Sequence, residues 1–178
     1  MTKYTHWLNQ PDSNVYFVTT TTTEFTPLFA DERYVRIVTS AIEVQIRAGR
    51  YSLVAYSVMP EHVHLIVKLH EGQEISSVVG ALKSWTSHRI TEALREDGYQ
   101  DVLTAFARHA RSAASYAVWQ QSFRAFPVTT ESVLWEKIRY IHNNAVHRGL
   151  VDGPEQYAFS SARNYAGMDD CILEVSLI

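Results

Sequence analysis

The chain has 178 residues, of which 46% are hydrophobic, 12% aromatic and 20% charged. This composition excludes a disordered, collagen-like or low-complexity protein, because the apolar surface is large enough to offset the entropy lost on ordering. The formal charge of -3 excludes a strong overall basic field of the kind that attracts nucleic acid without sequence preference. At this length we expect one domain spanning residues 1–178.

The sequence shows neither a pattern of cysteines nor a long apolar segment. Cys171 is the only cysteine, which excludes an internal disulfide and a zinc site built from several cysteines. The N-terminal segment lacks an apolar signal core, and no apolar run is long enough to cross a bilayer. We therefore expect a cytoplasmic protein with no membrane partner.

The first half of the chain predicts three strands and one helix. Residues 15–23 are rich in β-branched and aromatic side chains, which is typical of a strand. Apolar residues then recur at helical spacing from about residue 32 to a stop at Gly49. Strands at 51–58 and 62–69 follow, and the short turn between them predicts an antiparallel hairpin.

The second half predicts a long helix over 75–94 and a last helix over 131–147, with a strand at 118–128 between them. Residues 96–116 are interpreted as a helical insertion or connector, and residues 151–178 as a C-terminal tail. The order β-α-β-β-α-β-α predicts an α+β fold, in which a ferredoxin-like antiparallel sheet is sandwiched by α-helices.

Two histidines at the start of the third strand are the first candidates for chemistry. Residues two apart in a strand share a face, so His62 and His64 project together while Val63 faces away. Two adjacent imidazoles form half of a divalent metal site. The pattern is equally compatible with ordinary polar residues on a solvated face, opposite a core face that carries Val63, Leu65 and Val67.

The last helix carries a polar stripe beside its apolar one. Tyr140 and Asn144 are four residues apart, so they lie one above the other on the helix surface. A tyrosine hydroxyl beside a carboxamide oxygen suggests a nucleophile next to a metal ligand. A surface tyrosine packed on a helix edge explains the same spacing, so the spacing alone does not decide.

Four blocks in this order carry a family resemblance: MPEHVHLIV, VWQQSF, IRYIHNNAVHRGLV and PEQYAFSSARNYAG. From about Tyr16 to Gly167 the chain resembles the REP-associated tyrosine transposases, relatives of the single-tyrosine transposases of small bacterial insertion sequences. Those transposases are defined by a His-hydrophobe-His motif, matched here by His62-Val63-His64.

The resemblance implies an activity and a set of site residues. It implies that His62, His64 and Asn144 hold Mg²⁺ or Mn²⁺ and that Tyr140 is the catalytic nucleophile. The implied reaction cleaves and rejoins DNA through a 5′-phosphotyrosine link, and the implied substrate is single-stranded DNA that includes a hairpin. In this family the tyrosine helix packs so that its polar stripe faces the histidines.

Basic and aromatic residues near the two long helices are candidate DNA contacts. Lys83 and Arg89 lie on the predicted 75–94 helix, Lys137 and Arg148 flank the tyrosine, and Trp85 is placed to stack on a base. We expect the four cations near one face, where they would offset the net negative charge. Solvated helix surface is the alternative explanation for each.

Two departures from the family pattern keep other functions open. Arg124-Ala125-Phe126 stands where the family often has an aromatic-acid-His triplet, and Ala145 stands where proline is common. The first departure favours the alternative that the protein is a domesticated hairpin-DNA-binding protein with little or no cleavage. A cupin-type metalloenzyme is a further alternative, disfavoured by three long helical patterns. Both a monomer and a homodimer are compatible with the sequence.

Overall fold

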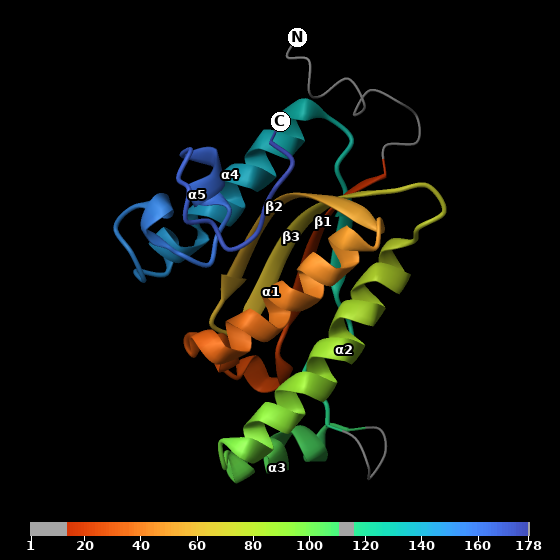
Figure 1. Cartoon of the computed structure of the whole chain (residues 1–178), viewed down its shortest axis with the longest axis vertical. Coiled ribbons are helices and arrows are strands. Elements are labelled where there is room, and N and C mark those ends of the chain that lie inside the picture. The colour runs from red at the N-terminus through yellow and green to blue at the C-terminus, as the bar shows by residue number, and fades with distance from the viewer. Residues whose placement is uncertain (1–13, 111–115, 178) are drawn as a thin grey trace.

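The computed structural model describes residues 14–110 and 116–177, and their centre is a four-stranded antiparallel sheet (Figure 1). The strand order is β2-β3-β1-β4, and every neighbouring pair is antiparallel. This order confirms the predicted α+β fold of ferredoxin-like type. The strands are β1 (Val15–Thr21), β2 (Tyr51–Met59), β3 (His62–Leu69) and β4 (Arg124–Pro127).

Helices cover both faces of this sheet. The helices α1 (Glu32–Arg47) and α2 (Ile75–Glu96) lie across one face, and α4 (Glu131–His147) packs on the other (Figure 1). A capping residue determines where α1 begins. The Asp31 side chain accepts a hydrogen bond from the Arg33 backbone N–H at 2.8 Å and so caps α1.

The strand β3 is buried on both sides, which excludes the alternative that its histidines lie on a solvated face. Val63, Leu65 and Val67 pack against α1 and α2 in one core cluster. Ile66 points the other way, into a second cluster with Leu134, Ile138 and Ile141 of α4. The histidine face of β3 is therefore covered in part by the tyrosine helix.

Two segments differ from the sequence expectation. Of the strand expected at 118–128, only β4 is a continuous strand along β1; Trp119 forms an isolated bridge with Thr22, and its Nε1–H donates to Thr86 Oγ1 at 2.9 Å. The connector expected at 96–116 contains the helix α3 (Gln100–Arg108), and its residues 111–115 lie outside the described part of the chain.

The C-terminal segment is more ordered than a simple tail. It contains a 3-10 turn at Pro154–Gln156 and the short helix α5 (Ala162–Tyr165). The backbone N–H of Ser161 donates to Tyr56 O at 2.9 Å, so this segment covers the edge of β2. Shorter 3-10 turns lie at Thr23–Phe25 and Leu28–Ala30. Within the described residues, no helix combines the length and apolar character that a bilayer crossing needs.

The packing of α4 on the sheet predicts a large cost for truncating its buried face. Ile141 is fully buried, so Ile141→Ala is expected to lower the free energy of unfolding by about 3 kcal/mol through lost burial and a residual cavity. The measurement is urea unfolding followed by circular dichroism. Val44→Ala on α1, where Val44 is 58% exposed, is the control and should change stability by less than about 0.5 kcal/mol. Equal effects for the two variants would contradict the packing described.

Candidate active site

The two histidines of β3 lie side by side on the face that α4 covers. Their ring centroids are 4.6 Å apart, and His64 is only 3% exposed. The register pairs His64 with Thr19 and His62 with Thr21 of β1. The phenyl ring of Phe17 stacks on His64 at 5.4 Å. Both imidazoles therefore have neighbours that fix their orientation.

Each imidazole uses its Nδ1 in a hydrogen bond, which leaves its Nε2 for another partner. The Nδ1 of His64 lies 2.8 Å from Thr19 Oγ1, and the Nδ1 of His62 lies 3.0 Å from Glu61 Oε1. Burial, with a smaller contribution from His62, lowers the pKa of His64 to about 3. Burial also lowers the pKa of His62, against the opposing effect of Glu61. Both rings are therefore neutral at pH 7, which is the form that binds metals.

The helix α4 brings Tyr140 and Asn144 to these rings. Asn144 Nδ2 lies 3.2 Å from His64 Nε2, and the Tyr140 ring centroid lies 5.3 Å from that of His64. Asn144 is buried, whereas Tyr140 is 46% exposed and rests its ring edge-on against Phe17 at 5.9 Å. The amide thus lies in the interior of the site and the phenol at its solvent-facing rim.

A buried carboxylate ties the end of α4 to the β2–β3 turn. Glu61 accepts hydrogen bonds from Arg148 Nη1 at 2.7 Å and Nη2 at 3.3 Å, and its Oε1 also faces His62. Burial alone would raise the pKa of Glu61, but Arg148 and His62 outweigh it and the pKa lies below its ordinary value. Arg148, Glu61 and His62 therefore form a continuous chain of contacts, which we call the Glu61 clamp.

The donor atoms fit a divalent cation held by two imidazoles and one carboxamide. The His64 Nε2 faces Asn144, and His62 keeps its Nε2 free of the Glu61 contact. Ligation through the amide oxygen requires the Asn144 carboxamide to turn over, which exchanges two atoms of similar size. In the described residues no group of three or more His, Cys, Asp or Glu side chains could hold a metal ion.

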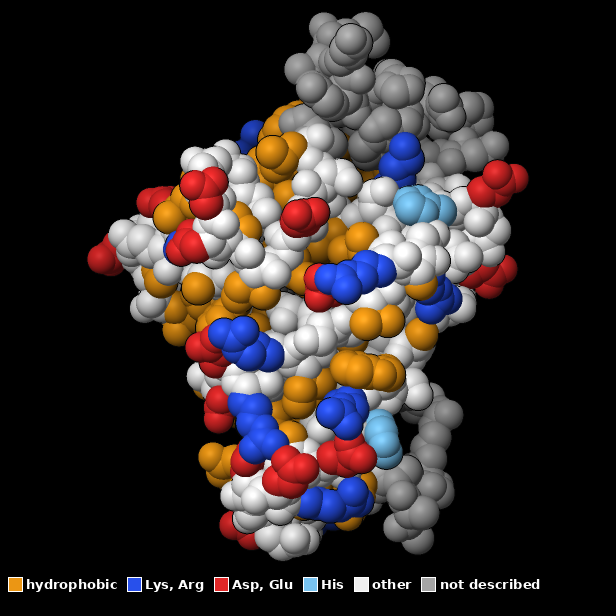
Figure 2. All heavy atoms as spheres, in the orientation of Figure 1, with side chains coloured by type: hydrophobic (Ala, Val, Ile, Leu, Met, Phe, Trp, Pro, Cys, Tyr) orange, Lys and Arg blue, Asp and Glu red, His pale blue; other side chains and the backbone are white. Residues whose placement is uncertain are grey.

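Three of the candidate DNA contacts lie elsewhere. Lys83, Trp85 and Arg89 are on α2, across the sheet from the histidines. The expectation that the four cations share one face is therefore wrong, because α2 and α4 pack on opposite faces. Figure 2 shows the α1–α2 face, where basic and acidic side chains alternate. Ion pairs of these two helices include Arg33 with Glu96 and Asp97, Arg36 with Glu32, Arg47 with Glu43, and Arg89 with Glu92.

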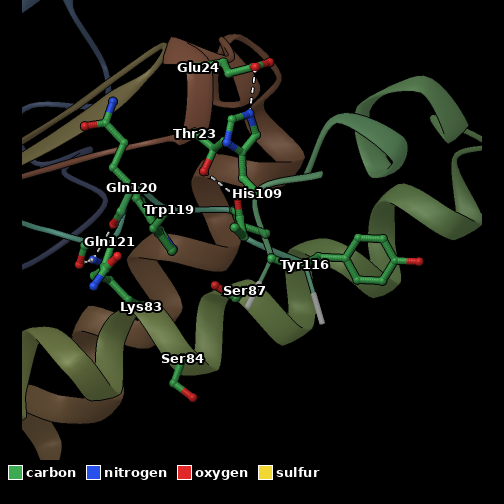
Figure 3. A pocket seen from close by; sticks show the side chains of 13 residues that line it. Thr23, Glu24, Lys83, Ser84, Ser87, His109, Tyr116, Trp119, Gln120 and Gln121 are labelled. Carbon is green, nitrogen blue, oxygen red and sulfur yellow. Dashed lines mark hydrogen bonds and ion pairs between the residues drawn. The ribbon is translucent and has the colours of Figure 1, made fainter. Parts of the chain in front are cut away.

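Lys83 forms hydrogen bonds with the backbone of the loop that precedes β4. Its Nζ donates to the carbonyl oxygens of Gln120 at 2.6 Å and Gln121 at 3.0 Å, at one wall of a cavity that also contains Trp119 (Figure 3). Burial lowers the pKa of Lys83. Trp85, on the same helix, is 44% exposed. The structure therefore gives Lys83 a role in holding the backbone.

Lys137 of α4 and Arg148, the residue that follows the C-terminal end of this helix, lie on the site face. Lys137 Nζ is 5.7 Å from the centroid of Phe17 and pairs with Glu136 at 2.8 Å. Arg148 is engaged in the Glu61 clamp. The sequence interpretation missed Glu61, Phe17 and Thr19 as members of the site. Only Glu61 had a usable signal, its place directly before His62, since the other two depend on strand register.

The comparison with known families agrees with this geometry. Residues 11–144 match the family model described as "Transposase IS200 like". The match covers most of the chain and includes both histidines, Tyr140 and Asn144. The chain therefore belongs to the IS200-like transposase family, and transposase activity is the class of activity that this family defines.

Individual relatives point the same way. A Haemophilus influenzae protein named as a REP-associated tyrosine transposase is 21% identical over 148 residues, which cover 83% of this chain and 78% of that protein. A solved REP-associated tyrosine transposase bound to a REP hairpin has a TM-score of 0.62 at 22% identity, covering 86% of this chain and 80% of that one. A transposase structure from Deinococcus radiodurans has a TM-score of 0.50 at 21% identity, covering 75% and 92%. The structural matches support the shared fold.

Proposed function

We propose that this protein is a metal-dependent tyrosine transposase that cleaves and rejoins hairpin-containing single-stranded DNA. The observation that carries the proposal is the convergence of His62, His64 and Asn144 beside a half-exposed Tyr140. The relative that is solved in complex with a REP hairpin supports hairpin DNA as the substrate.

Each site residue has a separate role in cleavage. His62, His64 and Asn144 would hold Mg²⁺ or Mn²⁺, and the bound ion would supply charge neutralisation at the scissile phosphate. Tyr140 Oη attacks phosphorus, the bond from phosphorus to the 3′ oxygen breaks, and a 5′-phosphotyrosine forms. The phenol loses a proton and the 3′ oxygen gains one, so no water is consumed. The exposed phenol lets a DNA strand approach from solvent.

The polarity of the covalent product tests this proposal. A hairpin oligonucleotide with single-stranded flanks, labelled at its 3′ end, is incubated with protein and Mn²⁺ and analysed on a denaturing gel. We expect a labelled protein–DNA adduct that EDTA prevents. The same strand labelled at its 5′ end should yield only a shorter free fragment that ends in a 3′ hydroxyl. An adduct that carries the 5′ label instead would contradict the proposed chemistry.

A hairpin-binding protein without turnover is the second candidate. Arg124-Ala125-Phe126 replaces the triplet that is common in the family, and this departure favours the second candidate. Tight hairpin binding without an adduct in Mg²⁺ or Mn²⁺ would select it over the transposase.

A further inference from the structure

The register of the sheet places two residues of β4 on the same face as the histidines. Residues directly opposite each other in antiparallel strands share a face. Arg124 pairs with Thr19, which pairs with His64, so these three side chains form one row across the sheet. Phe126 pairs with Phe17 in the adjacent row, and Phe17 stacks on the His64 ring.

This part of the face is open to solvent. The helix α4 packs on β2 and β3, while β4 is an edge strand with one partner, β1. Phe126 is 53% exposed, and Arg124 is also exposed. Ala125 between them points to the other side and packs against the core beneath α1 and α2. The strand therefore presents an aromatic ring and a guanidinium beside the site.

The charge of Arg124 is unpaired, unlike that of its neighbours. Lys137 pairs with Glu136, and Arg148 is bound by Glu61. Across the part of the chain that the structure describes, Arg124 has no carboxylate within ion-pairing distance. Arg124 is an exposed guanidinium without an acidic partner, and its strand lies next to β1, whose Phe17 contacts the exposed Tyr140. This position fits an anion that lies beside the reacting phosphate.

We propose that Arg124 and Phe126 form a binding subsite for the unpaired nucleotides that flank the scissile phosphate. The Phe126 ring stacks on one nucleobase, and the Arg124 guanidinium binds a neighbouring phosphate. Two strand spacings, roughly 10 Å, separate the Arg124 and His64 backbones. At this distance Arg124 contacts the phosphate of a nucleotide adjacent to the scissile one. The inference rests on the proposed function and specifies how its substrate is held.

Fluorescence of 2-aminopurine tests the stacking. The base is placed in turn at each flanking position of an uncleaved hairpin, bound to the Tyr140→Phe protein with Mn²⁺. We expect quenching at one position, lost in Phe126→Ala together with a roughly tenfold weaker affinity, and restored in Phe126→Trp. Val44→Ala, an exposed apolar truncation on the opposite face, is the control and should leave both signals unchanged.

The salt dependence of binding tests the phosphate contact. Arg124→Ala should weaken binding several-fold at low salt and reduce the slope of log K against log salt by roughly 0.7, the value for one phosphate on a single strand. Arg124→Lys should retain the slope, because it keeps the charge. Arg36→Ala on α1 is the matched control and should not change it.

Several results would overturn the subsite. One is that quenching and slope are unchanged in Phe126→Ala and Arg124→Ala. Another is a dimer that Phe126→Ala converts to a monomer without any effect on DNA, which would assign the edge of β4 to a second copy of the chain. Binding is measured without cleavage, on Tyr140→Phe, so the absence of quenching at every flanking position, while the parent protein forms the adduct, refutes the subsite alone. Quenching in Tyr140→Phe, when the parent protein with Tyr140 forms no adduct, refutes the chemistry alone.

Discussion

Replacing Tyr140 with phenylalanine is expected to reduce formation of the covalent protein–DNA adduct by at least roughly a thousandfold. The variant removes the attacking oxygen and keeps the ring that lies edge-on against Phe17 and at 5.3 Å from His64. Because Tyr140 is 46% exposed, the free energy of unfolding should change by less than about 0.5 kcal/mol. The measurement is the yield of 3′-labelled adduct over time, together with a thermal melt.

Tyr99→Phe is the matched control for this loss. Tyr99 is 48% exposed and precedes α3, on a different part of the molecule. The Tyr99→Phe protein should form the adduct at the rate of the parent. Adduct formation by Tyr140→Phe at that same rate would exclude Tyr140 as the nucleophile, whatever the behaviour of the other site residues.

Removing the carboxylate of the Glu61 clamp is expected to weaken Mn²⁺ binding by roughly ten- to a hundredfold. Glu61 accepts from the Nδ1 of His62 and so leaves the opposite ring nitrogen, Nε2, for the proposed metal. In Glu61→Ala this orientation is lost. Glu61→Gln keeps an acceptor oxygen for His62 and should weaken binding less. Free Mn²⁺ measured by electron paramagnetic resonance in a titration gives the affinity without any need for DNA or cleavage.

Two further variants separate the Glu61 clamp from other roles of its residues. Arg148→Ala leaves a buried carboxylate without its cation, and we expect it to destabilise the fold by about 2 kcal/mol, since the arginine itself is half-exposed. Glu43→Ala, which removes an exposed carboxylate of α1, should change neither stability nor metal affinity. If Arg148→Ala weakens DNA binding alone, its proposed phosphate contact is supported and the structural role is refuted.

The arrangement of the histidines and the tyrosine was accessible from sequence for a local reason. The alternation of β3 and the helical spacing of α4 determine which side chains share a face within each element. His62 with His64, and Tyr140 with Asn144, are pairs of this kind. The family resemblance then predicted that the two pairs meet, and the contact between Asn144 and His64 agrees with it.

Two contacts missed by the sequence interpretation depend on non-local pairing. Thr19 contacts His64 across 45 positions of the chain, and Arg148 contacts Glu61 across 87. A shift of strand register by one residue would turn Thr19 to the other face. Neither contact is therefore encoded in a spacing that the sequence displays.

The sequence by itself determined the order of strands and helices, the ferredoxin-like class and the two residue pairs that each share a face, because hydrophobic period and turn residues act over a few positions. The tertiary structure alone decided which face each element presents. It placed Lys83, Trp85 and Arg89 across the sheet from the site, and it brought Arg124 and Phe126 onto the histidine face. The physical reason is that a sheet has two faces, and only the packing of distant segments against them determines which residues become neighbours.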